Sequence, residues 1–300
     1  MIQATHVDLY NCDCVKGMAR LPEKSVHICV TSPPYNLGTD YGRYDDGQAR
    51  HEYLTWTRRW AMGVHRVLSD NGSFFLNVGA APSNPMLPHE ILSELKDFFV
   101  LQNTIHWIKS ITVETKDGQI ISTGHFKPIR SNRFITDCHE FIFHLTKGGN
   151  TPIDRLSIGV PYADKSNIKR WSHTKGADKR CRGNAWFIPY QTIHSREHQR
   201  PHPATFPEAL PKMCIQLHGW RSDLVMLDPF LGIGNSAVAA LECEIERFIG
   251  FEIDGGYLHT AEKRVKEVRA NPATGQSHEE CKGGPKRPPP SVAIGAGSGE

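Results

Sequence analysis

A short apolar run, a glycine loop and a helical pattern follow one another in residues 224–240. The apolar run, residues 224–227, ends at Asp228, and Gly232 and Gly234 lie in the loop before a helix that continues through Ala240. A strand that turns through glycines into a helix is typical of parallel sheets, because parallel neighbours need a helical crossover. The segment predicts an α/β fold with an open parallel sheet.

The rest of the chain alternates in the same way. In residues 52–69, apolar residues recur at steps of three and four, which predicts a helix with Trp56 and Trp60 on its buried face. Turn-forming residues at 69–72 precede the next strand. The other expected strands are residues 4–10, 26–30, 73–78, 99–110, 137–145 and 247–251, and the other expected helices are a short one through Leu21, residues 207–219 and one carrying Tyr257.

Four of the expected strands end beside a polar side chain. Asp13 follows residues 4–10, Ser32 follows residues 26–30, Asp228 ends residues 224–227 and Glu252 follows residues 247–251. Ligands of open α/β sheets bind at the carboxyl ends of the strands. If residues 224–228 form the first strand of the sheet, residues 247–251 the second, 4–10 the third and 26–30 the fourth, one crevice holds all four side chains.

The segment Ser32-Pro33-Pro34-Tyr35 lies at one of these strand ends. Proline fixes its own φ and holds the preceding residue extended, so Ser32 and Pro33 form a stiff row of oxygen acceptors. Such a row followed by an aromatic ring suits a planar base, which is gripped by its exocyclic amine and stacked on Tyr35. The alternative is a turn that only leads the chain out of a strand.

The glycine loop alone identifies no ligand, since glycine pairs close many strand-to-helix turns. The acid at Glu252 stands where dinucleotide folds bind ribose hydroxyls. The loop matches neither the G-x-G-x-x-G pattern nor the lysine of a phosphate-binding loop. A nucleoside-bearing cofactor without a diphosphate is therefore expected.

Residues 146–200 lack the periodicity of the flanking segments. Basic residues outnumber acidic ones there, and Trp171, Trp186 and Tyr190 are interleaved with them. This mixture suits contacts with phosphates and bases, and the alternative is a solvated, loop-rich surface. The candidate DNA contacts are Lys169, Arg170, Lys175, Arg180 and Arg182.

Composition bears on metal binding, the polyanionic partner and the location of the protein. The eight cysteines include no C-x-x-C pair and the sixteen histidines no H-E-x-x-H pattern, so we expect reduced cysteines and no metal site. The net charge of +3 is a weak sign of a polyanionic partner. Neither a signal peptide nor a membrane span is expected, which favours a cytoplasmic protein. From Asn271 onward large apolar residues are scarce, and we expect disorder.

Three motifs together resemble one family. Asp228-Pro229-Phe230 with Gly232 and Gly234 resembles the S-adenosylmethionine loop of DNA amino-methyltransferases, and Ser32-Pro33-Pro34-Tyr35 resembles their catalytic motif. The segment His202-Pro203-Ala204-Thr205-Phe206-Pro207, with Leu210, resembles their cofactor-helix motif. The order, catalytic motif first and cofactor loop last, is that of the β group. Ile233 and Asn235 depart from the small hydroxyl residues frequent in the family's loop.

The resemblance implies a Rossmann-like class I methyltransferase sheet, circularly permuted, with an inserted target-recognition region. It implies that S-adenosylmethionine contacts Asp228 at its methionine amino end, Glu252 at its ribose, Asp13 at its adenine and Phe230 along its body. The residues implied for cofactor binding are Asp13, His202, Pro203, Phe206, Asp228, Phe230, Gly232, Gly234, Asn235 and Glu252, and those implied for catalysis are Ser32, Pro33, Pro34 and Tyr35.

The expected organisation is a catalytic half in residues 1–145, a recognition insertion in 146–200, a cofactor-binding half in 201–270 and a tail in 271–300. The expected partner is double-stranded DNA, with a cognate restriction endonuclease as a further candidate, and the expected assembly is a monomer or a homodimer. Methylation at cytosine C5 would need a Pro-Cys nucleophile, which the catalytic motif lacks. By resemblance, a serine at the start of that motif favours methylation of cytosine N4, and adenine N6 is the alternative, since family members with aspartate there more often resemble adenine-N6 enzymes.

Two other classes of protein stay open. An enzyme that methylates RNA or a protein glutamine would keep the cofactor loop but has no need of a basic insertion. A DNA-binding module without activity would keep the insertion but has no reason to retain both the catalytic motif and Glu252.

Overall fold

The computed structural model of the protein describes residues 5–39, 41, 43–115, 117–124, 131–166, 168–174, 176–189 and 205–271. Its strands are β1 (His6–Asn11), β2 (Val26–Thr31), β3 (Leu68–Val78), β4 (Val100–Ile108), β5 (Ile111–Glu114), β6 (Ile120–Thr123), β7 (His139–Thr146), β8 (Ala185–Phe187), β9 (Val225–Asp228) and β10 (Arg247–Glu252). Its helices are α1 (Cys14–Met18), α2 (Arg50–Val67), α3 (Leu87–Leu95), α5 (Ala209–His218), α6 (Asn235–Glu242) and α7 (Gly255–Ala270), with a 3₁₀ turn at Ser172–Thr174.

The described strands form an eight-stranded sheet in the order β1-β10-β9-β2-β3-β7-β4-β8. The first five strands in this order run parallel, whereas β7 is antiparallel to both β3 and β4. Strands β1, β10, β9 and β2 are therefore adjacent, as expected, although residues 4–10, the third strand of the sequence analysis, lie beside the second strand and not beside the fourth. The permuted α/β sheet is confirmed, and its parallel half joins the amino-terminal and carboxyl-terminal parts of the chain.

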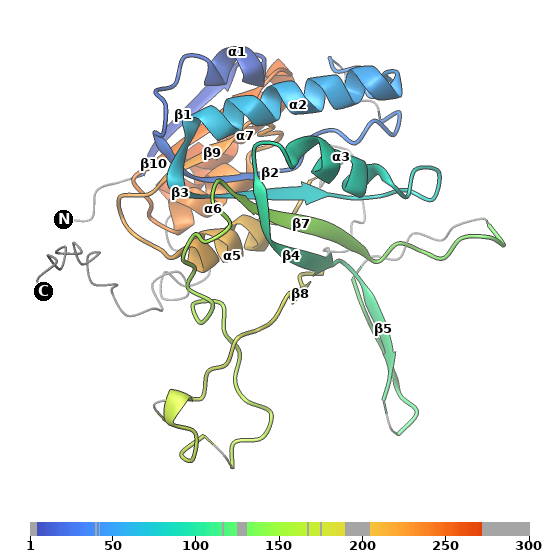
Figure 1. The fold of residues 1–300 in the computed structure, drawn as a ribbon, viewed down its shortest axis with the longest axis vertical. Helices are drawn as coiled ribbons and strands as arrows, with labels where there is room; N and C mark the ends of the chain where they lie inside the picture. The colour runs from blue at the N-terminus through green and yellow to red at the C-terminus, as the bar shows by residue number, and fades with distance from the viewer. Residues whose placement is uncertain are drawn as a thin grey trace, which may run out of the picture.

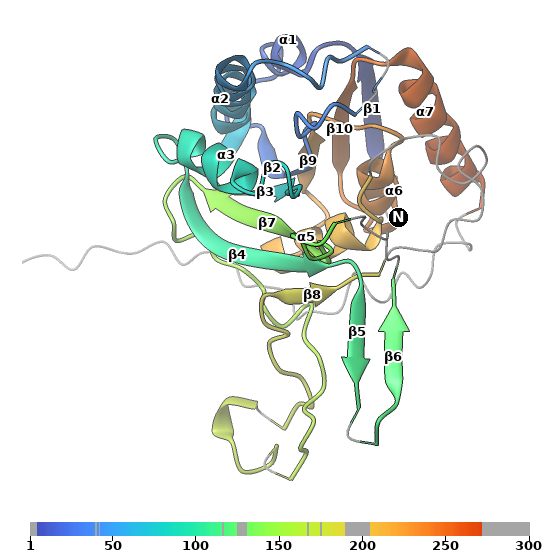
Figure 2. The same ribbon diagram turned by 90° about the vertical axis from the view of Figure 1, so that its right-hand side faces the viewer.

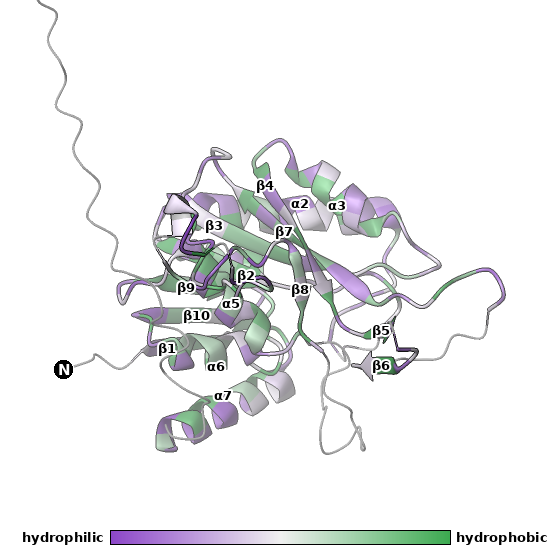
Figure 3. Ribbon diagram, turned by 90° about the horizontal axis from the view of Figure 1, so that it is seen from below, coloured by the Kyte–Doolittle hydropathy of each residue, from purple (hydrophilic) through white to green (hydrophobic). Residues whose placement is uncertain are grey.

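Helices cover both faces of the sheet (Figures 1 and 2), with α1, α2 and α3 on one face and α5, α6 and α7 on the other. Alternate residues of the central strands feed the two cores, as the period of two in a strand requires. Ile28 and Phe75 pack on the side of α5 and α6, whereas Cys29 and Phe74 pack on the side of α2. The central strands are accordingly the most hydrophobic part of the ribbon in Figure 3.

Helix α2 confirms the helix expected over residues 52–69. Trp60 is fully buried, and Trp56 is only partly buried because it faces an open pocket. The turn expected at residues 69–72 is instead an irregularity within β3, because Val26 pairs with Leu68 while Ile28 pairs with Ser73. Four residues of β3 bulge there between two paired positions.

Two segments project from the same end of the molecule (Figures 1 and 2). One is the hairpin of β5 and β6, and the other is the segment between β7 and β8, within the insertion expected at residues 146–200. This insertion also contributes β8 to the sheet, where Trp186 pairs with Trp107 and is 1% exposed. Trp186 is thus a core residue, in contrast to Trp171, which is 40% exposed.

The seven cysteines among the described residues form no disulfide. Cys281 and the tail beyond Asn271 lie outside the described residues. Among the helices that the structure describes, none combines the length and the apolar character needed to cross a membrane.

Candidate active site

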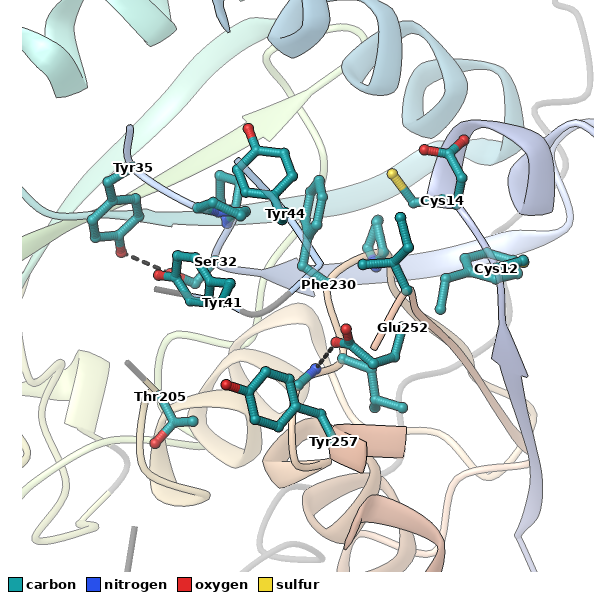
Figure 4. Close-up of a pocket in the computed structure, with 18 of the residues that line it drawn as sticks. Cys12, Cys14, Ser32, Tyr35, Tyr41, Tyr44, Thr205, Phe230, Glu252 and Tyr257 are labelled. Carbon is teal, nitrogen blue, oxygen red and sulfur yellow. Dashed lines mark hydrogen bonds between the residues drawn. The ribbon is translucent and has the colours of Figure 1, made fainter. Parts of the chain in front are cut away.

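An open pocket lies at the carboxyl ends of β1, β10, β9 and β2. Its empty volume, the mouth included, is about 970 Å³. The residues that line it are Cys12, Asp13, Cys14, Ser32, Pro33, Pro34, Tyr35, Tyr41, Tyr44, Trp56, Thr205, Phe206, Pro229, Phe230, Leu231, Gly232, Asn235, Phe251, Glu252, Ile253 and Tyr257. Figure 4 shows Ser32 and Tyr35 at one end, Glu252 and Cys12 toward the other, and Phe230 between them. The structure therefore brings the two expected motifs to one cavity.

Glu252 is the acid that forms the polar wall of the cofactor end. Its Oε2 accepts a hydrogen bond from the Gly232 backbone N–H at 2.8 Å, and its Oε1 accepts one from the Asp254 N–H at 2.9 Å. Burial raises the pKa of Glu252. Since a carboxylate offers about four lone-pair sites, two remain for hydroxyl donors in the pocket. Glu252 thus fits the ribose diol of a nucleoside.

Gly232 shapes the same wall. Its φ of 55° lies in the left-handed region, which glycine adopts without strain, and this conformation directs its N–H to Glu252. Gly234 has a φ of 84°, and a Cβ atom there would lie 2.8 Å from the Cβ of Ala261 on α7. Gly232 thus belongs to the cofactor wall, whereas Gly234 permits the close packing of α6 on α7.

Asp228 lies beneath the floor of the pocket and is 1% exposed. Its Oδ1 accepts hydrogen bonds from the Thr31 hydroxyl at 2.6 Å and the Phe230 N–H at 3.0 Å, and its Oδ2 accepts one from the Ser236 hydroxyl at 2.5 Å. Burial raises the pKa of Asp228 to about 6, against the opposing effect of these hydrogen bonds. The carboxyl group joins β9 to β2 and α6, so its contacts here are with the protein.

Four other residues expected to bind the cofactor line the same pocket, namely Asp13, Phe206, Phe230 and Asn235. Phe230 packs edge-on against Trp60 with ring centroids 5.3 Å apart, which presents its ring to the pocket. Asn235 Nδ2 donates to the carbonyl of Phe206 at 2.6 Å and so fastens the end of the cofactor-helix motif. Asp13 lines the pocket and caps α1 by accepting from the Lys16 N–H at 3.0 Å. His202 and Pro203 lie outside the described residues.

The catalytic end contains a hydrogen-bond network around Tyr35. The phenol oxygen of Tyr35 lies 2.7 Å from Ser32 Oγ, 2.9 Å from Asn77 Nδ2 and 3.1 Å from Glu140 Oε2. Lys109 Nζ pairs with Glu140 Oε1 at 2.9 Å. The carbonyl of Pro34 accepts from the Tyr53 hydroxyl at 2.8 Å, which fixes the motif to α2.

Sequence reasoning missed three members of this network, namely Asn77, Lys109 and Glu140. The sequence signals that could have identified these residues are their polarity and their positions in expected strands. Asn77 lies near the carboxyl end of the expected strand 73–78, and Glu140 directly precedes the apolar residues 141–143 of the expected strand 137–145. A buried polar side chain in an apolar strand needs a partner, which the sequence alone does not name.

The candidate DNA contacts lie on the segment between β7 and β8, away from the pocket. Lys169, Arg170 and Arg180 are exposed, whereas Arg182 is half-buried and its Nε donates to the carbonyl of Ile158 at 2.9 Å. Lys175 lies outside the described residues. Arg180 Nη1 also donates to the carbonyl of Cys181 at 3.2 Å, so the three side chains differ from Arg182 in their exposure and not in a lack of contacts.

Comparisons with known proteins agree with this geometry. A family model described as "DNA methylase", of the N6/N4 methylase family, matches residues 26–263. The type II methyltransferase M.ScaI of Streptomyces caespitosus is 27% identical, over 88% of this chain and 83% of the relative. The type II methyltransferase M.SmaI of Serratia marcescens is 26% identical, over 87% of this chain and 93% of the relative.

Solved structures share the fold. The PvuII DNA methyltransferase, described as cytosine-N4-specific, matches with a TM-score of 0.62 and 18% identity, over 91% of this chain and 95% of that one. A putative DNA modification methylase from Thermus thermophilus, solved with S-adenosylmethionine, matches with a TM-score of 0.58 and 24% identity, over 90% and 96% of the two chains. The family match spans the catalytic motif, the glycine loop and Glu252. The chain therefore belongs to the N6/N4 DNA methylase family, and S-adenosylmethionine is its cofactor.

Proposed function

We propose that this protein transfers a methyl group from S-adenosylmethionine to N4 of a cytosine that is flipped out of double-stranded DNA at a specific sequence. The observation that carries the proposal is Ser32 at the end of the pocket opposite Glu252. The resemblance of the motif associates serine at this position with cytosine N4. The fold that the chain shares with a cytosine-N4-specific enzyme supports the same choice.

The catalytic motif acts by accepting hydrogen bonds. The lone pair of a base amine is delocalised into the ring, and acceptors on its two N–H groups shift that lone pair toward the methyl group. Ser32 Oγ and the Pro33 carbonyl are the acceptors that we assign to this role. Bound S-adenosylmethionine supplies an already activated methyl group, so the residues here need only hold the amine in line with it. No covalent intermediate is required.

The ring of Tyr35 replaces the stacking that a base loses when it leaves the duplex. Tyr35 lines the pocket while its hydroxyl is fixed by neighbouring groups, so the ring is held in place before the base arrives. A rigid aromatic face lowers the entropic cost of binding the flipped base.

We assign DNA recognition to the segment between β7 and β8, on the support of its exposed basic residues Lys169, Arg170 and Arg180. Phosphate contacts there would fix the duplex, and neighbouring side chains would read base edges. The relatives M.ScaI and M.SmaI are named as type II methyltransferases. By analogy, a restriction endonuclease of the same sequence specificity is the expected companion.

The test is the identity of the methylated base. DNA incubated with the protein and S-adenosylmethionine is digested to nucleosides and analysed by mass spectrometry, and N4-methylcytosine is the expected product. Ser32→Ala should abolish most of it, whereas Ser25→Ala, at the opposite end of β2, should retain it. N6-methyladenine as the sole product would refute the cytosine assignment.

A further inference from the structure

We propose that Lys109 and Glu140 set the direction of the hydrogen bonds at the catalytic end, so that Ser32 meets the target amine as an acceptor. Glu140 would then be a positioning residue that acts through Tyr35. The inference deepens the proposed function and rests on the role of Ser32 as an acceptor for a base amine.

The backbone register places the ion pair. Glu140 in β7 pairs with Trp107 in β4, and the Lys109 N–H donates to the carbonyl of Cys138 at 2.7 Å. Lys109 therefore lies diagonally across from Glu140, two residues beyond Trp107, and the charged atoms of the two side chains are 2.9 Å apart with 19% and 11% of the side chains exposed. A shielded carboxylate needs such compensation, because removing a charge from water is costly.

An ionised Glu140 accepts hydrogen bonds and donates none. Asn77 Nδ2 donates to its Oε2 at 2.6 Å, and the Tyr35 hydroxyl reaches the same oxygen at 3.1 Å. Tyr35 has one hydroxyl proton. When that proton is directed to Glu140, the phenol oxygen is left to accept, and Ser32 Oγ lies 2.7 Å away as the donor.

This direction decides what Ser32 offers to the pocket. A serine hydroxyl is both donor and acceptor. With the Tyr35 proton on Glu140, the single proton of Ser32 goes to the Tyr35 oxygen 2.7 Å away. Asn77 Nδ2 reaches one lone pair of Ser32 Oγ at 3.3 Å, and the other lone pair accepts from one N–H of the amine while the Pro33 carbonyl accepts from the second. The opposite orientation would point the Ser32 proton at the amine lone pair, which must attack the methyl group. Glu140 thus makes the serine behave like a carboxylate, which only accepts.

The first test measures single-turnover transfer of a radiolabelled methyl group to DNA by the full-length protein. Glu140→Gln weakens the acceptor that orders the network, and we expect a rate about tenfold lower, equal to the loss of one hydrogen bond in the transition state. Binding of S-adenosylmethionine should not change. The matched control Glu267→Gln, at an exposed pair on α7, should have the rate of the wild type.

A second variant separates positioning from structural support. In Ser32→Asp the new carboxylate accepts hydrogen bonds without needing Glu140 to direct its proton. Because this carboxylate lies close to Glu140, repulsion between the two acids should lower the rate of methyl transfer. The double variant Ser32→Asp with Glu140→Gln should therefore be faster than either single variant. A double variant whose rate is reduced by the product of the two single-variant reductions would overturn the proposal, since a purely structural role of Glu140 predicts that result.

Tyr35→Phe keeps the ring but removes the hydroxyl that transmits the effect. Its rate of methyl transfer should be about tenfold lower than that of the wild type, as for Glu140→Gln. The double variant Tyr35→Phe with Glu140→Gln should be little slower than either single variant. Additive losses would again overturn the proposal, and this pair decides the question should Ser32→Asp fail to fold.

Because the label counts a methyl group on any base, this experiment is independent of which base is modified. If the wild type makes N6-methyladenine, the cytosine assignment fails and the network is still tested. If it makes N4-methylcytosine while Glu140→Gln keeps the full rate, the network inference alone fails.

Discussion

Replacing Asp228 by Asn should remove a pH-dependent contribution to the free energy of unfolding. Asp228 is 1% exposed and accepts from Thr31, Phe230 and Ser236. An Asn Oδ1 can accept from Thr31 and Phe230, and its Nδ2 can donate to the Ser236 hydroxyl. The variant therefore keeps the packing and loses only the titration.

The magnitude follows from the pKa. Burial raises the pKa of Asp228 from its ordinary 3.8 to about 6, so the folded state binds this proton more tightly than the unfolded state. The stabilisation is complete below about pH 3.8 and is lost as the pH rises through about 6. A difference of roughly two pKa units corresponds to about 3 kcal/mol. About 1.4 kcal/mol of this falls between pH 5 and 7.5.

Urea unfolding without S-adenosylmethionine measures the effect at pH 5, 6 and 7.5. The free energy of unfolding of the wild type minus that of Asp228→Asn should fall by about 1.4 kcal/mol across this range. Asp223→Asn is the control: burial is the largest single influence on Asp223, but its hydrogen bonds and the charges of Arg221 and His27 together outweigh burial and lower its pKa. A pH-independent difference for Asp228→Asn, or one of opposite sign, would refute the reasoning.

Three further predictions concern the cofactor wall, the basic segment and the sheet. Glu252→Gln should weaken S-adenosylmethionine binding by about tenfold in calorimetry, because a neutral amide is a poorer partner for hydroxyl donors. Each Ala substitution at Lys169, Arg170 and Arg180 should lower the salt slope of duplex binding by about 0.9, measured by titration in increasing salt. Trp186→Ala should cost about 3–5 kcal/mol of unfolding free energy in urea, because the ring is buried in the sheet.

Each has a control in the same region of the molecule. Asp254→Asn, at the N-cap of α7 beside Glu252, should change cofactor affinity less than Glu252→Gln does. Arg182→Ala should lower stability rather than the salt slope, because Arg182 holds the carbonyl of Ile158. Trp171→Ala should cost much less unfolding free energy, because Trp171 is 40% exposed whereas Trp186 is 1% exposed. Equal losses from Trp186→Ala and Trp171→Ala would contradict the assignment of Trp186 to the core.

The parallel strands that carry the pocket were predictable because each has a local signal, an apolar run followed by a polar residue. The hairpin of β5 and β6 gives no such signal. Its residues are almost all exposed, so neither face imposes an alternation of apolar and polar residues. Strand β8 has three residues, which is too short for any period to show.

The pocket residues likewise divide into those with a local signal in the sequence and those without one. Ser32, Tyr35 and Glu252 were predicted because each lies next to the end of an expected strand, so the sequence alone shows their position. Glu140 meets Tyr35 only through the pairing of β3 with β7, across 105 residues. The sequence also does not show whether an acid at a strand end points into the pocket. Glu252 lines the pocket, whereas Asp228 lies beneath it.

The two ends of the pocket consequently depend on different supports. At the cofactor end, backbone N–H groups of Gly232 and Asp254 hold Glu252, so its geometry follows from the turns after β9 and β10. At the catalytic end, Asn77 of β3 and Glu140 of the antiparallel strand β7 hold Tyr35. Substitutions in β4 and β7 can therefore alter how Ser32 presents itself to a base while the cofactor end stays as it is. In this fold, the antiparallel strands are where the chemistry at the target amine can be tuned independently of S-adenosylmethionine binding.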